Sequence, residues 1–452
     1  MFAAAVAVWS VPVLRGGRTV TFVGAMLIAG TIVGPFFFAI DGPIQISIDR
    51  VMFAAIIVML VCRYRLGTMT PPQLTRTDWW LMIAVGYFFV SALRGDAAEG
   101  STPPVARWLF YVAMPAGAYA MIRVTRVTDR DLRTLMNLWI GLSIYLAVTA
   151  LLEIKGLRGL VFPRYINDPS YVEFFGRGRG PLLNPIGNGV VMGGGLCCAA
   201  IRWFNSERIG RIVLTGCGVV IFGGVYATLT RSCWVGAVGG LAMMAMMYAP
   251  RWFRIWSAAC LALLIVAMSM GLKDQLMSFK RDANLSANEA AKSVELRPLL
   301  AIVAYEMWKD RPVFGHGFGQ YFVHHKPYHT DRGYGLPLEK VRVYVQHNAF
   351  LAVLVDTGLI GLSLMLGFAG MVTAAAVRVV RDPGRTHAGK QACLLWIGVT
   401  VVYVANAMFH DVTVIPMVQM FVVAAAAPVI RAATIDIARE TSVGVDRRAV
   451  AV

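Results

Sequence analysis

Long apolar runs recur along the chain and are separated by shorter polar connections. Each run is close to the roughly 20 residues that a helix needs to cross about 30 Å of hydrocarbon, so the pattern predicts an all-α membrane bundle of about twelve spanning helices. The apolar run 1–14 is short and lacks a basic leader and a convincing cleavage site, so we expect a partial span there rather than a removed signal peptide. The predicted spans are residues 20–40, 50–64, 78–94, 105–124, 132–152, 186–203, 211–228, 232–249, 253–272, 348–378, 392–410 and 412–431.

Two polar stretches are too long to be simple turns, and they divide the chain. We expect a bundle of about nine spans over residues 1–272, with a short outer loop at 153–185. A long loop at 273–346 follows, then the last spans at 347–431 and a tail at 432–452. Within the long loop, residues 289–310 predict an amphipathic helix that packs across the mouth of the bundle or lies in the membrane interface. Its apolar face is Leu296, Leu299, Leu300, Val303 and Met307.

Composition agrees with a membrane protein. The chain has 452 residues, of which 58% are hydrophobic and only 15% charged, whereas a soluble protein carries about a quarter charged. The net charge of +17 does not indicate nucleic acid in so apolar a chain. Basic residues here set the topology, contact anionic lipids or bind an anionic substrate. The seven cysteines lie in or beside apolar runs, so we interpret them as packing residues rather than disulfides or zinc ligands.

Arginines gather in every second connection between the predicted spans. Short basic connections stay in the cytoplasm, so this alternation gives the orientation of the chain. Both long loops are expected to be extracytoplasmic and the C-terminus cytoplasmic. The basic connections are 15–18, 63–76, 123–133, 202–211, 251–254 and 378–390; the others are short and acidic at 41–49 and 94–99, or long at 153–185 and 273–346.

The first candidate site is where the outer loop 153–185 enters the next span. Arg177 and Arg179 stand beside glycines, and planar guanidinium groups in such a place can bind a phosphate. Asn184 is placed to cap the following helix, which would leave backbone N–H groups near the same anion. The alternative is a charged interfacial turn without a ligand.

Two further candidates lie at other outer span ends. Arg231 stands in a very short turn between apolar spans, where a charge is costly unless it is paired or faces water; snorkelling to the headgroups is the alternative. His347 stands where the long loop re-enters the membrane. Its imidazole could accept a proton from a sugar hydroxyl at neutral pH, although a histidine at a helix start is more often structural.

Weaker signals favour plainer interpretations. His324, His325 and His329 have loose metal-ligand spacing without acidic or cysteine partners nearby, which favours a solvated loop. The pair Asp129 and Asp131 has acid-x-acid spacing but lies in a basic, cytoplasmic connection, on the wrong face for the other candidates. The chain has neither a phosphate-binding P-loop nor a dinucleotide fingerprint, so nucleotide-activated sugars and ATP are not expected as substrates.

Taken in order, the outer segments resemble the bacterial O-antigen ligase and polymerase superfamily over roughly residues 175–411. The resemblance depends on segments 179–185 (RGPLLNP), 229–232 (LTRS), 311–319 (RPVFGHGFG) and 347–361 (HNAFLAVLVDTGLIG). Family members often have Ser-Arg where this chain has Thr230-Arg231. The first five or so spans agree with the family in topology only.

The resemblance implies an all-helical enzyme similar to class C glycosyltransferases, in the bacterial inner membrane. Such enzymes transfer a glycan from an undecaprenyl-diphosphate carrier to a glycan or lipid acceptor hydroxyl on the periplasmic side, without metal or cofactor. The resemblance places the diphosphate-binding arginines at Arg179 and Arg231 and the catalytic base at His347. Supporting residues are expected at Arg177, Arg297, Arg311, Asn348 and His410.

Two other classes of function remain as alternatives. A transporter or flippase for lipid-linked sugars would show pseudo-repeated halves and broken helices near the midplane of the bilayer. A channel or receptor would need a polar pore lining. In this chain the polar candidates gather at one face, which favours the transferase. The sequence does not distinguish a ligase from a repeat-unit polymerase.

Overall fold

The computed structural model describes residues 18–40, 42, 45–96, 102–171, 173–248, 251–252, 255, 287–330, 333–435 and 437. Within these residues the regular structure is helical apart from one short antiparallel ribbon, in which β1 (Ala39–Ile40) pairs with β2 (Ile46–Ser47). The predicted all-α class is confirmed for this part of the chain.

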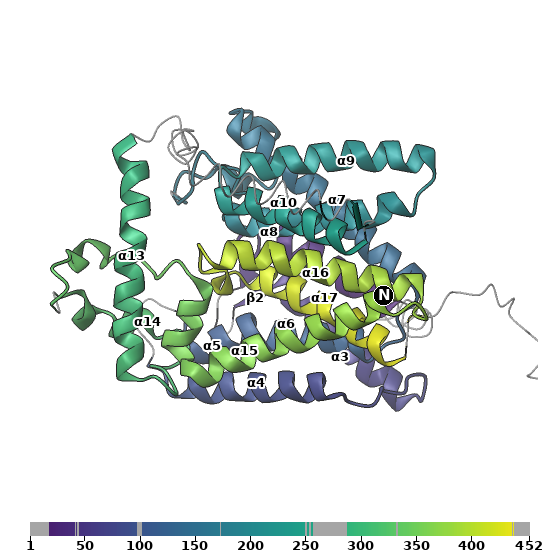
Figure 1. Ribbon diagram of the computed structural model, residues 1–452, viewed down its shortest axis with the longest axis horizontal. Coiled ribbons are helices and arrows are strands. Elements are labelled where there is room, and N and C mark those ends of the chain that lie inside the picture. The colour runs from purple at the N-terminus through teal and green to yellow at the C-terminus, as the bar shows by residue number, and fades with distance from the viewer. Residues whose placement is uncertain are drawn as a thin grey trace, which may run out of the picture.

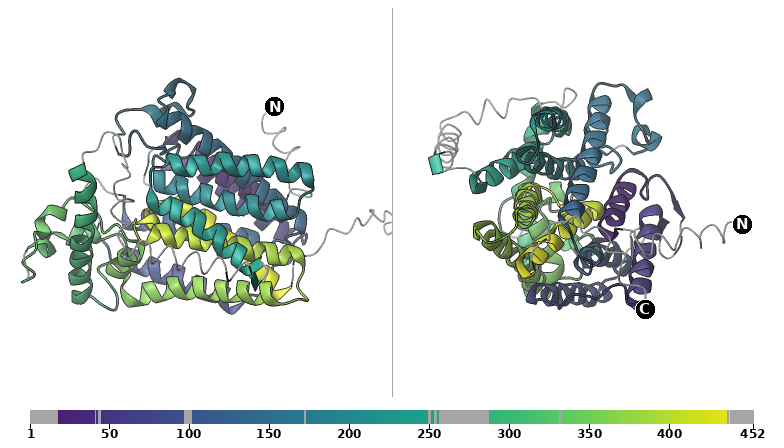
Figure 2. Two further views of the ribbon diagram at one scale, coloured as in Figure 1. Left: turned by 45° about the horizontal axis from the view of Figure 1, so that its top comes forward. Right: turned by 90° about the vertical axis from the view of Figure 1, so that its right-hand side faces the viewer.

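Long helices lie beside one another and form the bundle; Figure 1 shows several of them from the side and the right-hand view of Figure 2 shows most of them end-on. The helices of the bundle are α2 (Thr19–Ile32), α3 (Ile48–Arg65), α4 (Arg76–Leu93), α5 (Pro104–Trp108) continued through the π-helical turn η1 (Leu109–Ala113) into α6 (Met114–Arg123), α7 (Asp129–Ile154), α8 (Pro185–Phe204), α9 (Arg208–Ala227), α10 (Arg231–Tyr248), α15 (Ala349–Arg381), α16 (His387–Ala407) and α17 (Pro416–Thr434).

The described helices lie where spans were predicted, but fewer of them than predicted are long and apolar enough to cross a membrane. Residues 1–14 and the predicted span 253–272, apart from Ile255, lie outside the described residues, and each remaining predicted span overlaps a helix. Among the described helices, 6 are long and apolar enough to cross a membrane, fewer than the dozen expected. One reason is that α2 has only 14 residues, and another is that α3 carries charges near both ends. The six are Pro104–Arg123, Asp129–Ile154, Arg208–Ala227, Ala349–Arg381, His387–Ala407 and Pro416–Thr434.

The acid-x-acid pair has a structural role at the start of α7. Thr128 and Asp131 form a capping box: the Thr128 side chain accepts from the Asp131 N–H, and the Asp131 carboxylate accepts from the Thr128 N–H at 3.0 Å. The other Asp131 oxygen lies 3.4 Å from Arg18. Side chains that accept hydrogen bonds from two otherwise free N–H groups at the start of a helix stabilise its first turn. Asp131 therefore has a structural role at the start of α7.

α8 packs closely against its neighbours because one part of it consists of small residues. A Cβ added to Gly193 would lie 2.6 Å from Val402 of α16, and one added to Gly194 would lie 2.3 Å from Trp139 of α7. Small residues allow helix backbones to approach closely, which is how membrane helices gain van der Waals contact. Cys197 and Cys198 of α8 are fully buried free thiols, in keeping with packing residues.

α13 (Ala287–Asp310) crosses one end of the bundle and runs roughly perpendicular to the long helices (Figure 1). The buried side chains Leu299, Leu300, Val303 and Met307 belong to one hydrophobic cluster with residues of the loop that follows and with Val355 of α15. The predicted amphipathic helix is thus confirmed, and it packs across the mouth of the bundle. We call this end of the bundle, with α13 and residues 311–348, the loop end.

Several connections that lie far apart in the chain meet at the loop end. The Gly178 N–H donates to the Ala227 carbonyl at 2.9 Å, and the Gln320 side chain bonds the backbone of Asp96. The short elements of this end are η2 (Arg158–Leu160), η3 (Arg164–Asn167), α14 (Tyr321–His324), η5 (Lys326–His329), η6 (Leu338–Val341) and η7 (Val412–Val414).

Candidate functional site

His347 and His410 meet at the loop end although they belong to different connections. Their ring centroids lie 6.4 Å apart, and the Tyr344 ring lies 6.3 Å from His347 on another side. Both imidazoles are half-buried. His347 has a left-handed backbone with φ of 46°, which is strained for a residue with a side chain.

Asn348 fixes this arrangement with both ends of its amide. Its Oδ1 accepts from the N–H groups of Phe350 and Leu351 at 2.9 and 3.0 Å, which caps α15. Its Nδ2 donates to the carbonyl of Met408 at 3.0 Å, in the connection that carries His410. Asn348 therefore joins the two histidine-bearing segments, in agreement with a supporting role.

Arg297 reaches the same connection from α13. Its guanidinium carbon lies 5.4 Å from the centre of the Phe409 ring, next to His410. Arg311, in contrast, follows the other end of this helix and is exposed. Fourteen residues separate the two arginines, which is roughly 20 Å along a helix. Of these two supporting arginines, the structure brings only Arg297 to the connection that carries His410.

Arg231 opens α10 beside a buried asparagine that connects it to the histidines. The next two side chains, Ser232 and Cys233, lie 3.0 and 3.2 Å from Asn406 Oδ1. The Asn406 carbonyl accepts from the His410 N–H at 2.9 Å. The start of α10 and the end of α16 are thus held together, and the Arg231 segment adjoins the His410 connection.

Arg177 holds the turn that precedes Arg231. Its Nε donates to the Thr228 carbonyl at 3.2 Å, and its Nη2 donates to the Leu229 carbonyl and to Thr230 Oγ1. Arg177 is buried, so these bonds stabilise the turn from within. The expected supporting residue therefore acts on the backbone that positions Arg231.

Arg179 is buried among backbone carbonyls. Its Nη1 donates to the carbonyls of Tyr171 and Glu173, and its Nη2 to those of Ile166 and Asp168 at 2.7 and 3.3 Å. Burial lowers the pKa of this guanidinium, whose charge persists at any physiological pH. Both terminal nitrogens are thus engaged in holding the outer loop, a geometry that differs from the expected open phosphate site.

Glu153, at the end of α7, supports the same segment from the other side. Its carboxylate accepts from the backbone N–H groups of Arg179 and Gly180 at 3.2 and 2.8 Å. Sequence reasoning placed Glu153 at a loop boundary and gave it no role. The signal that could have found it is a carboxylate at the membrane end of a span, which is costly without a partner.

The glycine-rich segment 311–319 pairs with the segment that follows His347. α15 departs from helical geometry at Gly358, with φ of 66° and ψ of −168°. The Leu359 N–H donates to the Pro312 carbonyl at 2.9 Å, and the Gly317 N–H donates to the Asp356 carbonyl at 2.8 Å. A Cβ at Gly358 would lie 2.2 Å from the Val313 oxygen. Two motifs of the resemblance are therefore contact partners, and glycine allows their close approach.

Backbone strain is concentrated in these segments. Among the described residues other than glycine, positive φ occurs at Phe174, Leu183, Leu229 and His347. The last three lie in motifs of the resemblance, and Phe174 lies in the outer loop shortly before Arg177. Such conformations cost free energy and persist where the surrounding structure imposes them, often at functional sites.

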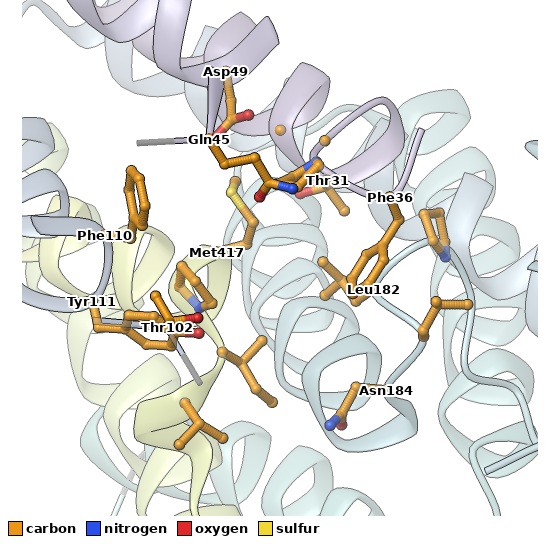
Figure 3. A pocket seen from close by; sticks show the side chains of 18 of the residues that line it. Thr31, Phe36, Gln45, Asp49, Thr102, Phe110, Tyr111, Leu182, Asn184 and Met417 are labelled. Atoms are coloured by element: carbon orange, nitrogen blue, oxygen red, sulfur yellow. The ribbon is translucent and has the colours of Figure 1, made fainter. Parts of the chain in front are cut away.

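A cavity of about 800 Å³ opens beside this region, between α2, α3, η1, the 165–184 loop and α17. Its size is in the range of ligand pockets in proteins. In Figure 3, Thr31, Gln45 and Asp49 lie on one side of the cavity, Asn184 on the opposite side, and Phe110 and Tyr111 close another wall. Asn184 caps α8, as expected, by accepting from the N–H groups of Ile186 and Gly187.

Arg50 is a cavity residue that sequence reasoning missed. It lines the cavity, its guanidinium carbon lies 3.4 Å from the centre of the Phe110 ring, and it donates to the Gln45 carbonyl. The signal was present, because Arg50 is a charged residue at the start of a predicted apolar span.

The histidines of the outer loop correct one expectation. His325 and His329 are buried rather than solvated, with only 4% and 0% of their surface exposed. His325 Nδ1 lies 2.8 Å from His329 Nε2, and His329 Nδ1 lies 3.0 Å from the Leu338 carbonyl. These side chains bond each other and the loop backbone and pack in its interior. The spacing of the histidines along the sequence does not reveal this burial. In the described part of the chain no group of three or more metal-ligating side chains occurs.

Comparison with known protein families gives a match over part of the chain. Residues 216–366 match the family model described as O-antigen ligase. This range contains Arg231, Arg297, Arg311 and His347, and it includes the paired segments 311–319 and 355–360. Arg177, Arg179 and His410 lie outside it. The resemblance stated from the motifs is thus confirmed. No curated protein matches the chain.

Proposed function

This protein belongs to the O-antigen ligase superfamily through residues 216–366, and on that basis we propose that it transfers a glycan from an undecaprenyl-diphosphate carrier to an acceptor hydroxyl. The family supports glycan transfer of the ligase or polymerase type in general. The carrier, the use of no metal and the location at the outer face of a bacterial inner membrane are part of the proposal. In the proposal the acceptor is a glycan or a lipid.

The observation that carries the proposal is the convergence on residues 406–410. His347 faces His410, Asn348 bonds the Met408 carbonyl, Arg297 lies over Phe409, and the residue after Arg231 bonds Asn406. Groups that can take up a proton and groups that can bind an anion thus come together from four separate segments. Acyl- or glycan-transfer chemistry needs both kinds of group at one place.

His347 serves as the general base in this proposal. The acceptor oxygen attacks the anomeric carbon, its proton passes to the imidazole, and the bond between that carbon and the diphosphate oxygen breaks. The electron pair of the broken bond remains on the diphosphate. Imidazole is a common general base because it can accept a proton near neutral pH, and it is suited to this step.

Arg231 stabilises the departing diphosphate. Charge grows on the leaving group as the bond breaks, and a preorganised guanidinium that binds it more tightly in the transition state lowers the barrier by about 3 kcal/mol. Because positive charge is supplied by the protein, we expect no requirement for a divalent cation.

Arg179 shapes the wall of the large cavity in this proposal. Its carbonyl partners include Tyr171 and Glu173, and both line that cavity. Direct binding of a diphosphate by Arg179 would require it to exchange carbonyl partners for phosphate oxygens. We therefore propose that the main role of Arg179 is to organise the cavity that binds the donor. Arg50 supplies a positive charge within that cavity.

A reconstituted reaction tests the proposal. Purified protein in lipid nanodiscs is incubated with an undecaprenyl-diphosphate oligosaccharide, with EDTA present, and the lipid and glycan products are separated by mass. Release of undecaprenyl diphosphate together with a longer or transferred glycan is expected. If sealed vesicles show only movement of the intact lipid-linked sugar across the bilayer, the protein is a flippase and the enzyme proposal fails.

A further inference from the structure

A second, smaller cavity lies between the large cavity and the histidines. It measures about 60 Å³, and it shares the lining residues Tyr111 and Val414 with the large cavity. We call it the polar chamber. Space of this size holds a few water molecules or the edge of one sugar ring. Its polar lining residues are Arg107, Tyr111, Tyr321, Gln346, Asp356, Asp411 and Thr413.

Three lining side chains hold polar atoms without a partner in the described structure. They are Tyr321 Oη, Gln346 Oε1 and Asp356 Oδ1, each shielded from solvent. Tyr321 and Gln346 are themselves only 4% and 5% exposed. Buried polar atoms are satisfied in most native structures, so three together around one cavity indicate groups that a bound molecule would satisfy.

Neighbouring bonds hold these atoms in place. The second oxygen of Asp356 accepts from the Gly319 N–H at 2.8 Å, and Arg107 donates to the Gly319 carbonyl at 3.1 Å. Asp411 accepts from the Thr413 N–H at 3.1 Å. Asp356, Arg107 and Asp411 are thus each tied to the protein, and Asp356 keeps an oxygen for the chamber.

The mixture of groups selects the kind of ligand. An amide oxygen and a carboxylate oxygen require donors, whereas the phenol and the guanidinium can donate. Two carboxylates and one guanidinium disfavour an anion such as a diphosphate. Adjacent sugar hydroxyls meet these needs because each hydroxyl both donates and accepts.

We propose that the polar chamber binds the hydroxylated edge of the acceptor sugar, with Tyr321, Gln346 and Asp356 as its hydrogen-bonding residues. Two lining residues directly adjoin the histidines in the chain, since Gln346 precedes His347 and Asp411 follows His410. A ring held there lies beside the proposed base. The role of this sugar as acceptor rests on the proposed function. The binding of a sugar in the chamber does not.

Tyr321→Phe is the sharpest test because it removes only the phenol oxygen, which has no protein partner to lose. Tyr328→Phe is the matched control: Tyr328 is similarly buried in the same loop, does not line the chamber, and donates to Asp310 at 2.6 Å. Tyr321→Phe should leave thermal unfolding unchanged, whereas Tyr328→Phe should lower the unfolding temperature through loss of its bond.

Sugar binding is measured directly by saturation-transfer NMR on the purified full-length protein in nanodiscs. The probes are methyl glycosides of glucose, galactose, rhamnose, N-acetylglucosamine and heptose. At least one should bind the unmodified protein, and Tyr321→Phe should weaken that binding about tenfold while Tyr328→Phe leaves it unchanged. Equal binding by Tyr321→Phe, or no binding of any probe, would overturn the inference.

Kinetics separate this inference from the proposed function. If transfer occurs and Tyr321→Phe raises the KM for the acceptor but not for the donor, both stand. If transfer occurs with an unchanged acceptor KM, the chamber assignment fails and the transferase stands. If no transfer occurs but Tyr321→Phe loses sugar binding, the chamber is a sugar site and the transferase proposal fails.

Discussion

The imidazole rings of His347 and His410 lie 6.4 Å apart at an interplanar angle of 81°, although 63 positions separate them in the chain. Asn348 and Asn406 hold the two backbones on which the rings are carried. The pair therefore depends on hydrogen bonds between connections and not on either connection alone. This relationship is the basis for the predictions about the base.

His347→Ala should lower the rate of glycan transfer by about a hundredfold or more, because general base catalysis contributes on the order of 10² to 10⁴ in rate. Donor binding should remain, since the base does not contact the carrier in the proposal. Release of undecaprenyl diphosphate measures the rate. His387→Ala is the control, because His387 begins α16 at the opposite end of that helix from His410. A His347→Ala protein with normal turnover would eliminate the proposed base.

Arg231→Ala and Arg179→Ala should differ in what they damage. Loss of Arg231 should cut transfer about a hundredfold through loss of about 3 kcal/mol of transition-state stabilisation, with little change in thermal unfolding. Loss of Arg179 leaves four backbone carbonyls of the outer loop without their donor, so it should lower both the unfolding temperature and the activity.

Thermal unfolding followed by intrinsic fluorescence, together with the transfer assay, compares the two arginine variants. Arg208→Ala serves as the control, since Arg208 begins α9 at the end away from Ala227 and the site. If Arg179→Ala is inactive yet unfolds at the normal temperature, Arg179 binds substrate directly and the organising role is wrong.

Gly358→Ala should uncouple the outer loop from α15. The new Cβ would lie 2.2 Å from the Val313 oxygen, and the positive φ alone costs about 1–3 kcal/mol for a residue with a side chain. We expect a lower unfolding temperature and faster proteolysis within residues 311–319. Gly370→Ala, in the same helix with nothing near its added Cβ, should be neutral or stabilising by up to about 1 kcal/mol. Equal stability of the two variants would contradict the pairing.

The outer loop should lose stability as the pH falls. Burial, and after it the neighbouring His329, lower the pKa of His325 to about 4, below the ordinary value of 6.5. The folded loop therefore binds fewer protons than the unfolded chain between these values. Its stability is fully present above pH 6.5 and declines as the pH falls from about 6.5 towards 4.

Thermal unfolding between pH 8 and 4.5 measures this effect. His325→Gln keeps an amide donor for His329 and removes the titrating group, so its unfolding temperature should depend less on pH. If both proteins respond to pH identically, His325 is not the group responsible.

Several features of the site followed from local pattern. The amphipathic face of α13 was visible in the spacing of Leu299, Leu300, Val303 and Met307, because helical periodicity is set by the backbone. The cap at Asn184 followed from the residue type at the end of a polar segment. The candidates His347 and His410 were recognisable because polar side chains at the mouth of apolar spans are few.

Other features were out of reach of local pattern. Nothing in the spacing of Arg179 predicts that four carbonyls of residues 166–173 surround its guanidinium. The burial of His325 and His329, the loop-end location of Arg311 away from the histidines, and the cavity residue Arg50 depend likewise on which loops fold over which.

The sequence by itself determined that apolar helices alternate with polar connections and which connections share an end, because hydropathy and charge act residue by residue. Only the tertiary structure decided which donors meet which acceptors. A guanidinium, an imidazole or a carboxylate takes its role from the partners that folding brings within about 3 Å, and those partners come from distant parts of the chain.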